Sequence, residues 1–337
     1  MLTKKIIKMV RNALLSLFTC VHLTSFGQIN NLNHADNYET VPYGSLGSVE
    51  KIGNGKQPMI LIAGWGFDGN IFRPLTDSQQ HEYTMYVVTL PGFGNTKAPP
   101  MPKNNTSYSD LYWTNGIIQA LKGLIQREQM NRPILMSYFT YSNVIALRIA
   151  LDYPELIDKV VILSGMARFM ANYPSYEPTS LQSRIYYTEQ VLAQKWFKTV
   201  SKETWDQGNF TPVGFSKDTL TAQKYWNQMS SVPIPIMVRY LLEYYCTDLS
   251  LEYEKLKVPT LVVMPQFTQE VFKEPGNAYW STFFHHSWWG AKPANSNFHL
   301  ITISDSHAMI LEDQPDKLLD VINLFASGKL SPYDLKR

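Results

Sequence analysis

The sequence predicts an α/β domain: a mainly parallel sheet flanked by helices and interrupted by a helical insertion. Between residues 58 and 165, short apolar runs typical of buried strands alternate with helical patterns, which favours a parallel sheet covered on both faces. Residues 168 to about 250 hold no convincing strand, and the strand pattern returns at residue 258. A chain of 337 residues that is 45% hydrophobic can bury such a core.

The first part of the core is expected to span residues 28–167. One or two early strands are expected between residues 38 and 49. Buried strands follow as short apolar runs at residues 58–63, 83–90, 133–136 and 160–163. Residues 104–107 offer N-cap side chains for a helix, in which Ile117, Ile118, Leu121, Leu124 and Ile125 recur at helical spacing. A second helix is expected over residues 144–151, ended by Tyr153-Pro154.

The insertion is expected to span residues 168–250 and to form a helical cap rich in aromatic side chains. Pro233 and Pro235 predict a break between two of its helices. The second part of the core, residues 251–337, carries expected strands at residues 258–264 and 298–303 and a last helix at 315–325. The concentration of Tyr, Trp and Phe side chains between residues 186 and 245 predicts an aromatic, apolar pocket beneath the cap, facing His307.

The first 27 residues have the plan of a secretory signal peptide. A basic segment ending at Arg11 precedes a short apolar run, and Ser25-Phe26-Gly27 places small residues at the −3 and −1 positions of a cut before Gln28. We therefore expect an exported protein, periplasmic or secreted, with no stable membrane span once the leader is removed. An uncleaved N-terminal anchor and a lipoprotein attached through Cys20 are the alternatives.

Charge and cysteine content limit the function classes. Removing residues 1–27 leaves 26 basic and 28 acidic residues, so nothing indicates a nucleic-acid surface. Only Cys246 then remains, which rules out an internal disulfide in the cleaved chain. No Cys/His spacing predicts a structural zinc site, and no cofactor is implied.

Several motifs occur in the order of one enzyme superfamily. They are residues 61–66 (LIAGWG), 90–96 (LPGFGNT), 146–155 (ALRIALDYPE), 247–261 (beginning TDL and ending VPTL) and 306–315 (beginning SH and ending EDQP). Together they resemble the α/β-hydrolases, capped and esterase-like, over roughly residues 40 to 330. The resemblance implies the α/β-hydrolase fold with a cap, and a nucleophile on a sharp turn written G-x-S-x-G.

The expected nucleophile is a threonine. The segment matching the turn reads YFTYS over residues 138–142, and the helix motif at 146–150 places Thr140 at the nucleophile position. Ser137 and Ser142 are rival hydroxyls outside that register. The resemblance assigns the oxyanion hole to the backbone N–H groups of Trp65 and Tyr141. A β-branched residue is costly at the positive φ of this turn, so we expect either relaxed geometry or lost hydrolysis.

The expected base is His307, which follows the last strand as the family's catalytic His does. The family's acid position, a few residues after the strand ending at Met264, holds Thr268, so Glu270 is the candidate acid from a remodelled loop. Asp305 is close in sequence but expected to point away. His285 and His286 are expected to form pocket wall or packing rather than to act as ligands.

The resemblance therefore implies hydrolysis of an ester or related acyl bond in a small, apolar substrate, through Thr140 and His307. A protein of a different class competes with it: an inactive relative that binds a small hydrophobic ligand without turnover. A third reading keeps His307 as the base for non-hydrolytic chemistry such as isomerisation or C–C cleavage.

Overall fold

The computed structural model describes residues 40–103, 106–168, 180–196, 198, 200–208, 211–273, 284, 287–288 and 295–330. The expected signal peptide, Cys20, His285 and His286 lie outside these residues. Within the described part, no helix is both long enough and apolar enough to span a membrane.

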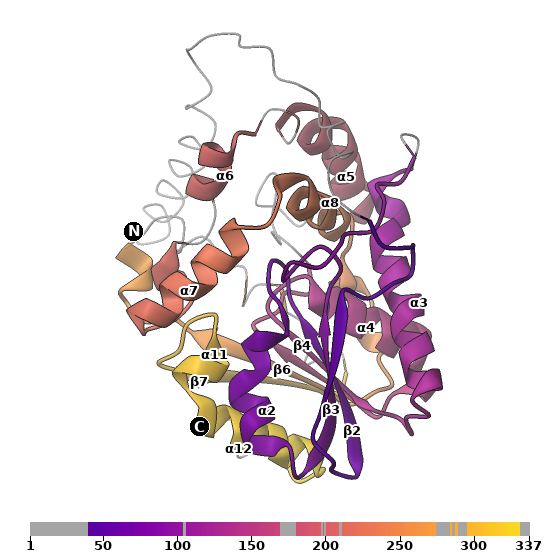
Figure 1. Ribbon diagram of the computed structural model, residues 1–337, viewed down its shortest axis with the longest axis vertical. Helices are drawn as coiled ribbons and strands as arrows, with labels where there is room; N and C mark the ends of the chain where they lie inside the picture. Colours follow the sequence, from indigo (N-terminus) through magenta and orange to yellow (C-terminus); the bar gives the residue numbers. More distant parts are fainter. Residues whose placement is uncertain are drawn as a thin grey trace.

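A seven-stranded sheet forms the centre of the molecule (Figure 1). Its strand order is β1-β3-β2-β4-β5-β6-β7; β1 runs antiparallel to β3 and every other pairing is parallel. The strands are β1 Ser48–Ile52, β2 Gln57–Ala63, β3 Tyr83–Thr89, β4 Ile134–Tyr138, β5 Lys159–Leu163, β6 Thr260–Gln266 and β7 Phe298–Ser304. Every residue of β4 is buried, as expected of a strand covered on both faces.

Helices cover both faces of the sheet (Figure 1), with α2 and α12 on one face and α3 and α4 on the other. Their bounds are α2 Arg73–Gln79, α3 Tyr112–Arg127, α4 Ser142–Asp152, α11 Ile310–Asp313 and α12 Pro315–Ala326. Short 3₁₀ helices occupy Gly69–Phe72, Tyr108–Asp110, Pro154–Leu156, Pro212–Gly214, Leu249–Leu251, Tyr253–Lys255 and Val271–Lys273.

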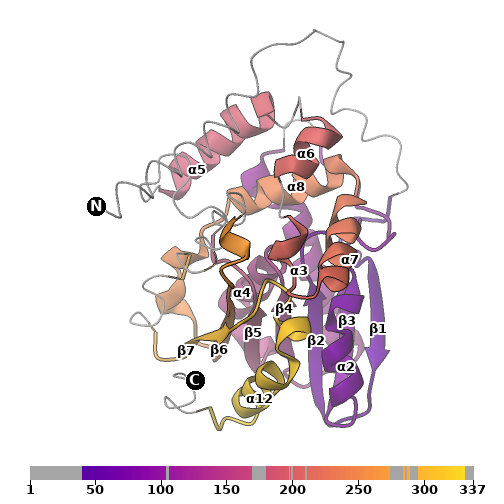
Figure 2. The same cartoon turned by 90° about the vertical axis from the view of Figure 1, so that its left-hand side faces the viewer.

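The helical insertion lies between β5 and β6. It contains α5 Leu181–Tyr187, a π-helix over Thr188–Trp196, α6 Lys202–Gly208, α7 Thr219–Ser230 and α8 Ile234–Tyr245. It sits over the carboxyl ends of the parallel strands (Figure 2). The Trp65 indole N–H, just after β2, donates to Met237 O of α8, and the Tyr240 hydroxyl donates to Pro91 O just after β3.

Most predicted elements are confirmed, with small shifts at their ends. The first main helix begins at Tyr112 rather than near 107, because Ser107 and Asp110 form a capping box around a separate 3₁₀ turn. The predicted proline break is present: Pro233 is the N-cap of α8, and Pro235 lies in its first turn. The early strand β1 extends to Ile52, beyond its expected end.

Candidate active site

Thr140 lies on the sharp turn between β4 and α4. Phe139 and Thr140 both have left-handed backbones, with φ of 69° and 50°. The Phe139 N–H donates to Leu163 O (2.9 Å) and the Thr140 N–H donates to Ser164 O (3.1 Å), so neighbouring β5 holds the turn in place. The predicted position of Thr140 is thus the one that the structure gives. Its strained backbone is of the kind that concentrates at functional sites.

The rival hydroxyls do not occupy the turn. Ser137 is buried within β4, and Ser142 opens α4 with its hydroxyl directed to Tyr138 O at 3.4 Å. Tyr138, which stands where the motif has a small residue, is fully buried, and its hydroxyl accepts from the Leu311 N–H (3.1 Å). The bulky side chain therefore joins β4 to α11, close after His307 in the chain.

Two backbone N–H groups beside the turn have no acceptor. They belong to Trp65 and Tyr141, and neither donates a hydrogen bond within the part of the chain that the structure describes. The loop carrying Trp65 lies against the turn: a Cβ on Gly64 would come within 1.8 Å of Phe139 O. Only glycine permits this approach. The loop and turn together hold the two N–H groups that the resemblance assigns to an oxyanion hole.

His307 is buried three residues beyond β7. Its backbone N–H donates to Asp313 Oδ2 (2.7 Å), Phe267 stacks on the ring, and Nδ1 has no partner. Burial lowers the pKa of the imidazole below its ordinary value, an effect that the carboxylate of Asp313 partly offsets. This shift favours the neutral imidazole, which is the form that a general base requires.

Thr268 occupies the acid position. Its Oγ1 lies 2.8 Å from His307 Nε2, in the place where the alignment of the motifs puts it. Glu270, the candidate acid, does not replace it: its exposed carboxylate pairs with Lys273 Nζ at 2.6 Å. Asp305 is also engaged elsewhere, with Lys217. The expectation that Glu270 reaches the imidazole is corrected, because the 3₁₀ turn after Thr268 directs its carboxylate toward solvent and Lys273.

Ser164 bridges the turn and the histidine loop. Its carbonyl accepts from the Thr140 N–H, and its buried hydroxyl donates to Ala308 O at 2.6 Å. The Thr140 hydroxyl itself is buried and makes no hydrogen bond, so it is not bonded to His307. We expect the Thr140 hydroxyl to lie within hydrogen-bond reach of His307 or one water away; the direct bond is absent among the described residues, and Ser164 links the two backbones.

Comparisons with known proteins support the fold. No protein-family profile matches the chain. The thermophilic esterase of Thermogutta terrifontis has a similar structure, with a TM-score of 0.60 and 16% identity over 84% of this chain and 94% of the esterase. This chain has the α/β-hydrolase fold.

Sequence relatives are esterases too. Pimeloyl-[acyl-carrier protein] methyl ester esterase of Shewanella woodyi is 30% identical over 43% of this chain and 54% of the esterase. The enzyme of the same name from Legionella pneumophila strain Lens is 22% identical over 63% of this chain and 76% of that enzyme. The chain thus spans about half the length of several of the esterases it matches. Its sequence and structural similarity is to ester hydrolases.

The aromatic side chains of this α/β-hydrolase fold form packed core beside the turn. Tyr225 of the insertion and Phe215 both make edge-to-face pairs with Phe67, which also packs on Phe139. Thr140 and His307 are 3% and 2% exposed. The expectation that these rings line an open pocket facing His307 is therefore not met in this conformation, because the rings fill the space themselves.

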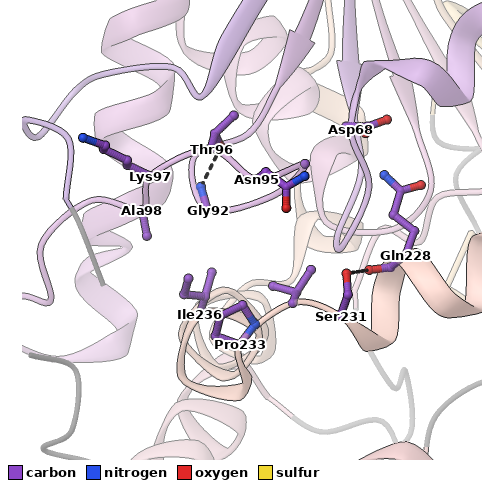
Figure 3. Close-up of a pocket in the computed structure, with 12 residues that line it drawn as sticks. Asp68, Gly92, Asn95, Thr96, Lys97, Ala98, Gln228, Ser231, Pro233 and Ile236 are labelled. Atoms are coloured by element: carbon purple, nitrogen blue, oxygen red, sulfur yellow. Dashed lines mark hydrogen bonds between the residues drawn. The ribbon is translucent and has the colours of Figure 1, made fainter. Parts of the chain in front are cut away.

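A cavity of about 510 Å³ opens nearby, between the loop after β3 and the junction of α7 and α8 (Figure 3). Asp68, Asn95 and Gln228 give it polar walls, while Val232 and Ile236 supply apolar ones. Neither Thr140 nor His307 lines it. Within the described ranges, no group of three or more His, Cys, Asp or Glu residues could hold a metal ion.

Sequence reasoning missed the role of Glu243, a fully buried carboxylate on α8. Oε1 accepts from the Trp113 N–H and the Arg239 guanidinium, and Oε2 accepts from the Thr114 N–H and hydroxyl. A signal was available, because an Arg and a Glu four residues apart stand within an otherwise apolar helix.

Proposed function

We propose that this protein hydrolyses an ester or related acyl bond of a small, largely apolar substrate. Thr140 Oγ1 attacks the carbonyl carbon while His307 takes its proton, and the N–H groups of Trp65 and Tyr141 hold the tetrahedral oxyanion. The intermediate expels the alcohol, which receives the proton from His307. Water then attacks the acyl-threonine, His307 again acts as base, and the acid product leaves with Thr140 restored.

The supporting observation is a pair of buried polar atoms without partners on the two residues assigned to the reaction. Thr140 Oγ1 and His307 Nδ1 make no hydrogen bond within the described part of the chain. Each such atom costs folding free energy, on the order of 1–3 kcal/mol. Buried polar atoms without partners lower the stability of the fold and are typical of functional sites. The N–H groups of Trp65 and Tyr141, which also have no acceptor among the described residues, lie beside the same turn.

The substrate must reach a site that is closed in this conformation. The cavity beside Asp68 provides the approach, because Asp68 follows the Trp65 loop by three residues and α7 and α8 form its opposite wall. A Cβ on Gly66 would meet Met229 Cγ at 2.8 Å and Met237 Cε at 3.3 Å. Flexible methionine side chains thus cover the oxyanion loop, and their apolar surface suits an apolar substrate. We propose that the part of the insertion that precedes α8 acts as a cap that moves to admit it.

A fluorophosphonate probe tests the assignment, because it labels an activated hydroxyl covalently. We expect the wild-type protein to be labelled and Thr140→Ala and His307→Ala to be silent, while Ser142→Ala is the matched control that stays labelled. Thr140→Ser is expected to keep or raise hydrolysis of p-nitrophenyl acetate, because it removes a methyl group from a crowded turn. Loss of the nucleophile typically costs several orders of magnitude in rate. Full turnover in Thr140→Ala would exclude the assignment.

A second candidate, a binding protein without turnover, is favoured by one contact. His307 Nε2 faces the Thr268 hydroxyl, and no carboxylate hydrogen-bonds to the ring among the described residues. Removing only the orienting carboxylate of a triad lowers kcat by about four orders of magnitude. A wild-type protein inert to the probe, in which Thr140→Ser combined with Thr268→Asp gains labelling, would establish this reading.

We also propose that the protein is exported after removal of residues 1–27, on the strength of the basic segment, the apolar run and Ser25-Phe26-Gly27. N-terminal sequencing of the protein made in a Gram-negative host is the measurement. A mature chain beginning at Gln28 supports export, whereas an intact leader on a membrane-bound product contradicts it.

A further inference from the structure

Helix α8 is built into the core of the molecule, although it belongs to the insertion. Its ten residues from Ile236 to Tyr245 are all buried. It contacts both residues that provide the oxyanion N–H groups. The Trp65 indole donates to Met237 O at 3.1 Å, and the Tyr141 ring packs against Tyr240 and Tyr244. A lid that opens and closes would not be expected to carry such contacts.

A chain of hydrogen bonds joins α8 to Tyr141. The Thr114 hydroxyl donates its single proton to Glu243 Oε2 at 2.7 Å, and the other partners of this carboxyl group are also donors. The contact between the Thr114 and Tyr141 hydroxyls must then have Tyr141 as its donor. Burial first, and then the nearby carboxylate of Glu243, raise the pKa of Tyr141 well above its ordinary value, so the phenol keeps that proton. The donor and the acceptor of each hydrogen bond from Tyr141 through Thr114 to Glu243 are thereby fixed.

Glu243 is in turn held rigidly. Five donors converge on its two oxygens: the N–H groups of Trp113 and Thr114 at the start of α3, two nitrogens of Arg239, and the Thr114 hydroxyl. The Glu243 side chain is 0% exposed and that of Arg239 is 5% exposed. Such a fully satisfied network, remote from water, specifies one arrangement of α3, α8 and Tyr141.

We propose that Glu243 is a positioning residue that acts through Thr114 and Tyr141 to aim the Tyr141 N–H at the oxyanion. The inference rests on the proposed function, because only an acyl-transfer site needs that N–H aimed. The hydroxyl of Tyr141 and its backbone N–H belong to one residue at the start of α4. Fixing the side chain therefore fixes the direction of the peptide group, and a misaimed donor loses transition-state stabilisation more than substrate binding.

The test is Tyr141→Phe, which deletes only the hydroxyl, and Thr114→Val, which deletes the link to Glu243. We expect kcat for p-nitrophenyl acetate to fall about tenfold in each with KM changed less than twofold, since complete loss of an oxyanion donor costs about 10² to 10³. The double variant is expected to be no slower than either single one, because both act through one chain. Tyr253→Phe is the matched control: it removes a buried tyrosine hydroxyl that donates to Ser287 O (2.7 Å), and its kcat is expected to be unchanged.

A second readout separates failure of this inference from failure of the proposed function. In protein labelled with ¹⁵N-tyrosine, the Tyr141 amide signal is identified by its loss in Tyr141→Phe. We expect Thr114→Val to shift that signal and Tyr253→Phe to leave it in place, whether or not the protein turns over esters. An unchanged Tyr141 amide in Thr114→Val, or single-variant kcat values equal to that of Tyr253→Phe, would overturn the inference. An inert wild type whose amide shifts as expected would contradict the proposed function alone.

Discussion

The sharpest prediction concerns stability at Thr140, where the proposed function and folding make opposite demands. Thr140→Val replaces the hydroxyl by a methyl group of similar size and keeps the branched Cβ, so the strain at φ 50° is the same before and after. The hydroxyl is buried and has no partner, so its removal breaks no hydrogen bond. The substitution therefore isolates the free energy of one buried, unsatisfied hydroxyl.

The magnitude follows from two contributions. Burying a hydroxyl without a partner costs about 1–3 kcal/mol. A buried methyl group in its place gains about 0.8 kcal/mol. We expect Thr140→Val to raise the free energy of unfolding by about 2–4 kcal/mol, the sum of the two, while hydrolysis and fluorophosphonate labelling are lost. A gain in stability together with a loss of activity is the pattern expected where selection has retained a strained functional group.

Urea denaturation of the wild type and the variant measures the difference, with Thr260→Val as the matched control. Thr260 is also fully buried, but its hydroxyl donates to Val258 O at 3.0 Å. The same chemical change there breaks a hydrogen bond and is expected to lower stability by about 1 kcal/mol. If Thr140→Val destabilises the protein as much as Thr260→Val does, the hydroxyl has a partner and the reasoning fails. Full turnover in Thr140→Val would equally refute it.

Three further predictions follow from the same site. Thr268→Asp places a carboxylate beside His307 Nε2, so we expect a raised imidazole pKa by NMR titration and at least a tenfold gain in kcat; an unmoved pKa would contradict it. Burial lowers the pKa of His307, so the unfolded protein binds more protons than the folded protein as the pH falls through about 6.5. We therefore expect the free energy of unfolding to fall between pH 7 and pH 5, and to fall less in His307→Gln. Urea denaturation at the two pH values measures the difference. Gly64→Ala would bring a Cβ within 1.8 Å of Phe139 O, so we expect a loss of more than about 3 kcal/mol or insoluble protein, and a normal unfolding curve would refute the close approach.

The sheet could be predicted from sequence because its strands are buried on both faces and read as continuous apolar runs. The turn at Thr140 could be placed as well, since a strand and a helix of known register bracket it. The predicted contact of Glu270 with His307 is wrong for a physical reason. The number of residues between two positions does not determine the direction in which a side chain points from a tight turn. The structure sends that carboxylate to Lys273 and leaves Thr268, two residues earlier, against the imidazole.

The fit of Tyr138 was the least predictable feature. Tyr138 stands where the G-x-S-x-G motif has glycine, yet the ring is buried and its hydroxyl accepts from the Leu311 N–H. The Tyr138 side chain fits because its hydroxyl bonds to Leu311, which lies 173 residues away in the chain. No local sequence pattern indicates a contact at that distance. Helix α8 was predicted as cap for a related reason. Its position between the strands of the core in sequence predicts a cap helix, although a sequence that is apolar except for Arg239 and Glu243 is typical of a buried helix.

The two departures from the esterase pattern act on different steps, so they need not have the same consequence. A threonine in place of serine keeps a nucleophilic hydroxyl, and its main cost is conformational. A threonine in place of the acid keeps a hydrogen bond to the imidazole but removes the charge that stabilises the imidazolium formed during attack. The barrier to turnover should therefore lie at Thr268 more than at Thr140. On this reasoning, Thr268→Asp alone should recover more activity than Thr140→Ser alone, and the reverse order would place the limiting defect at the nucleophile.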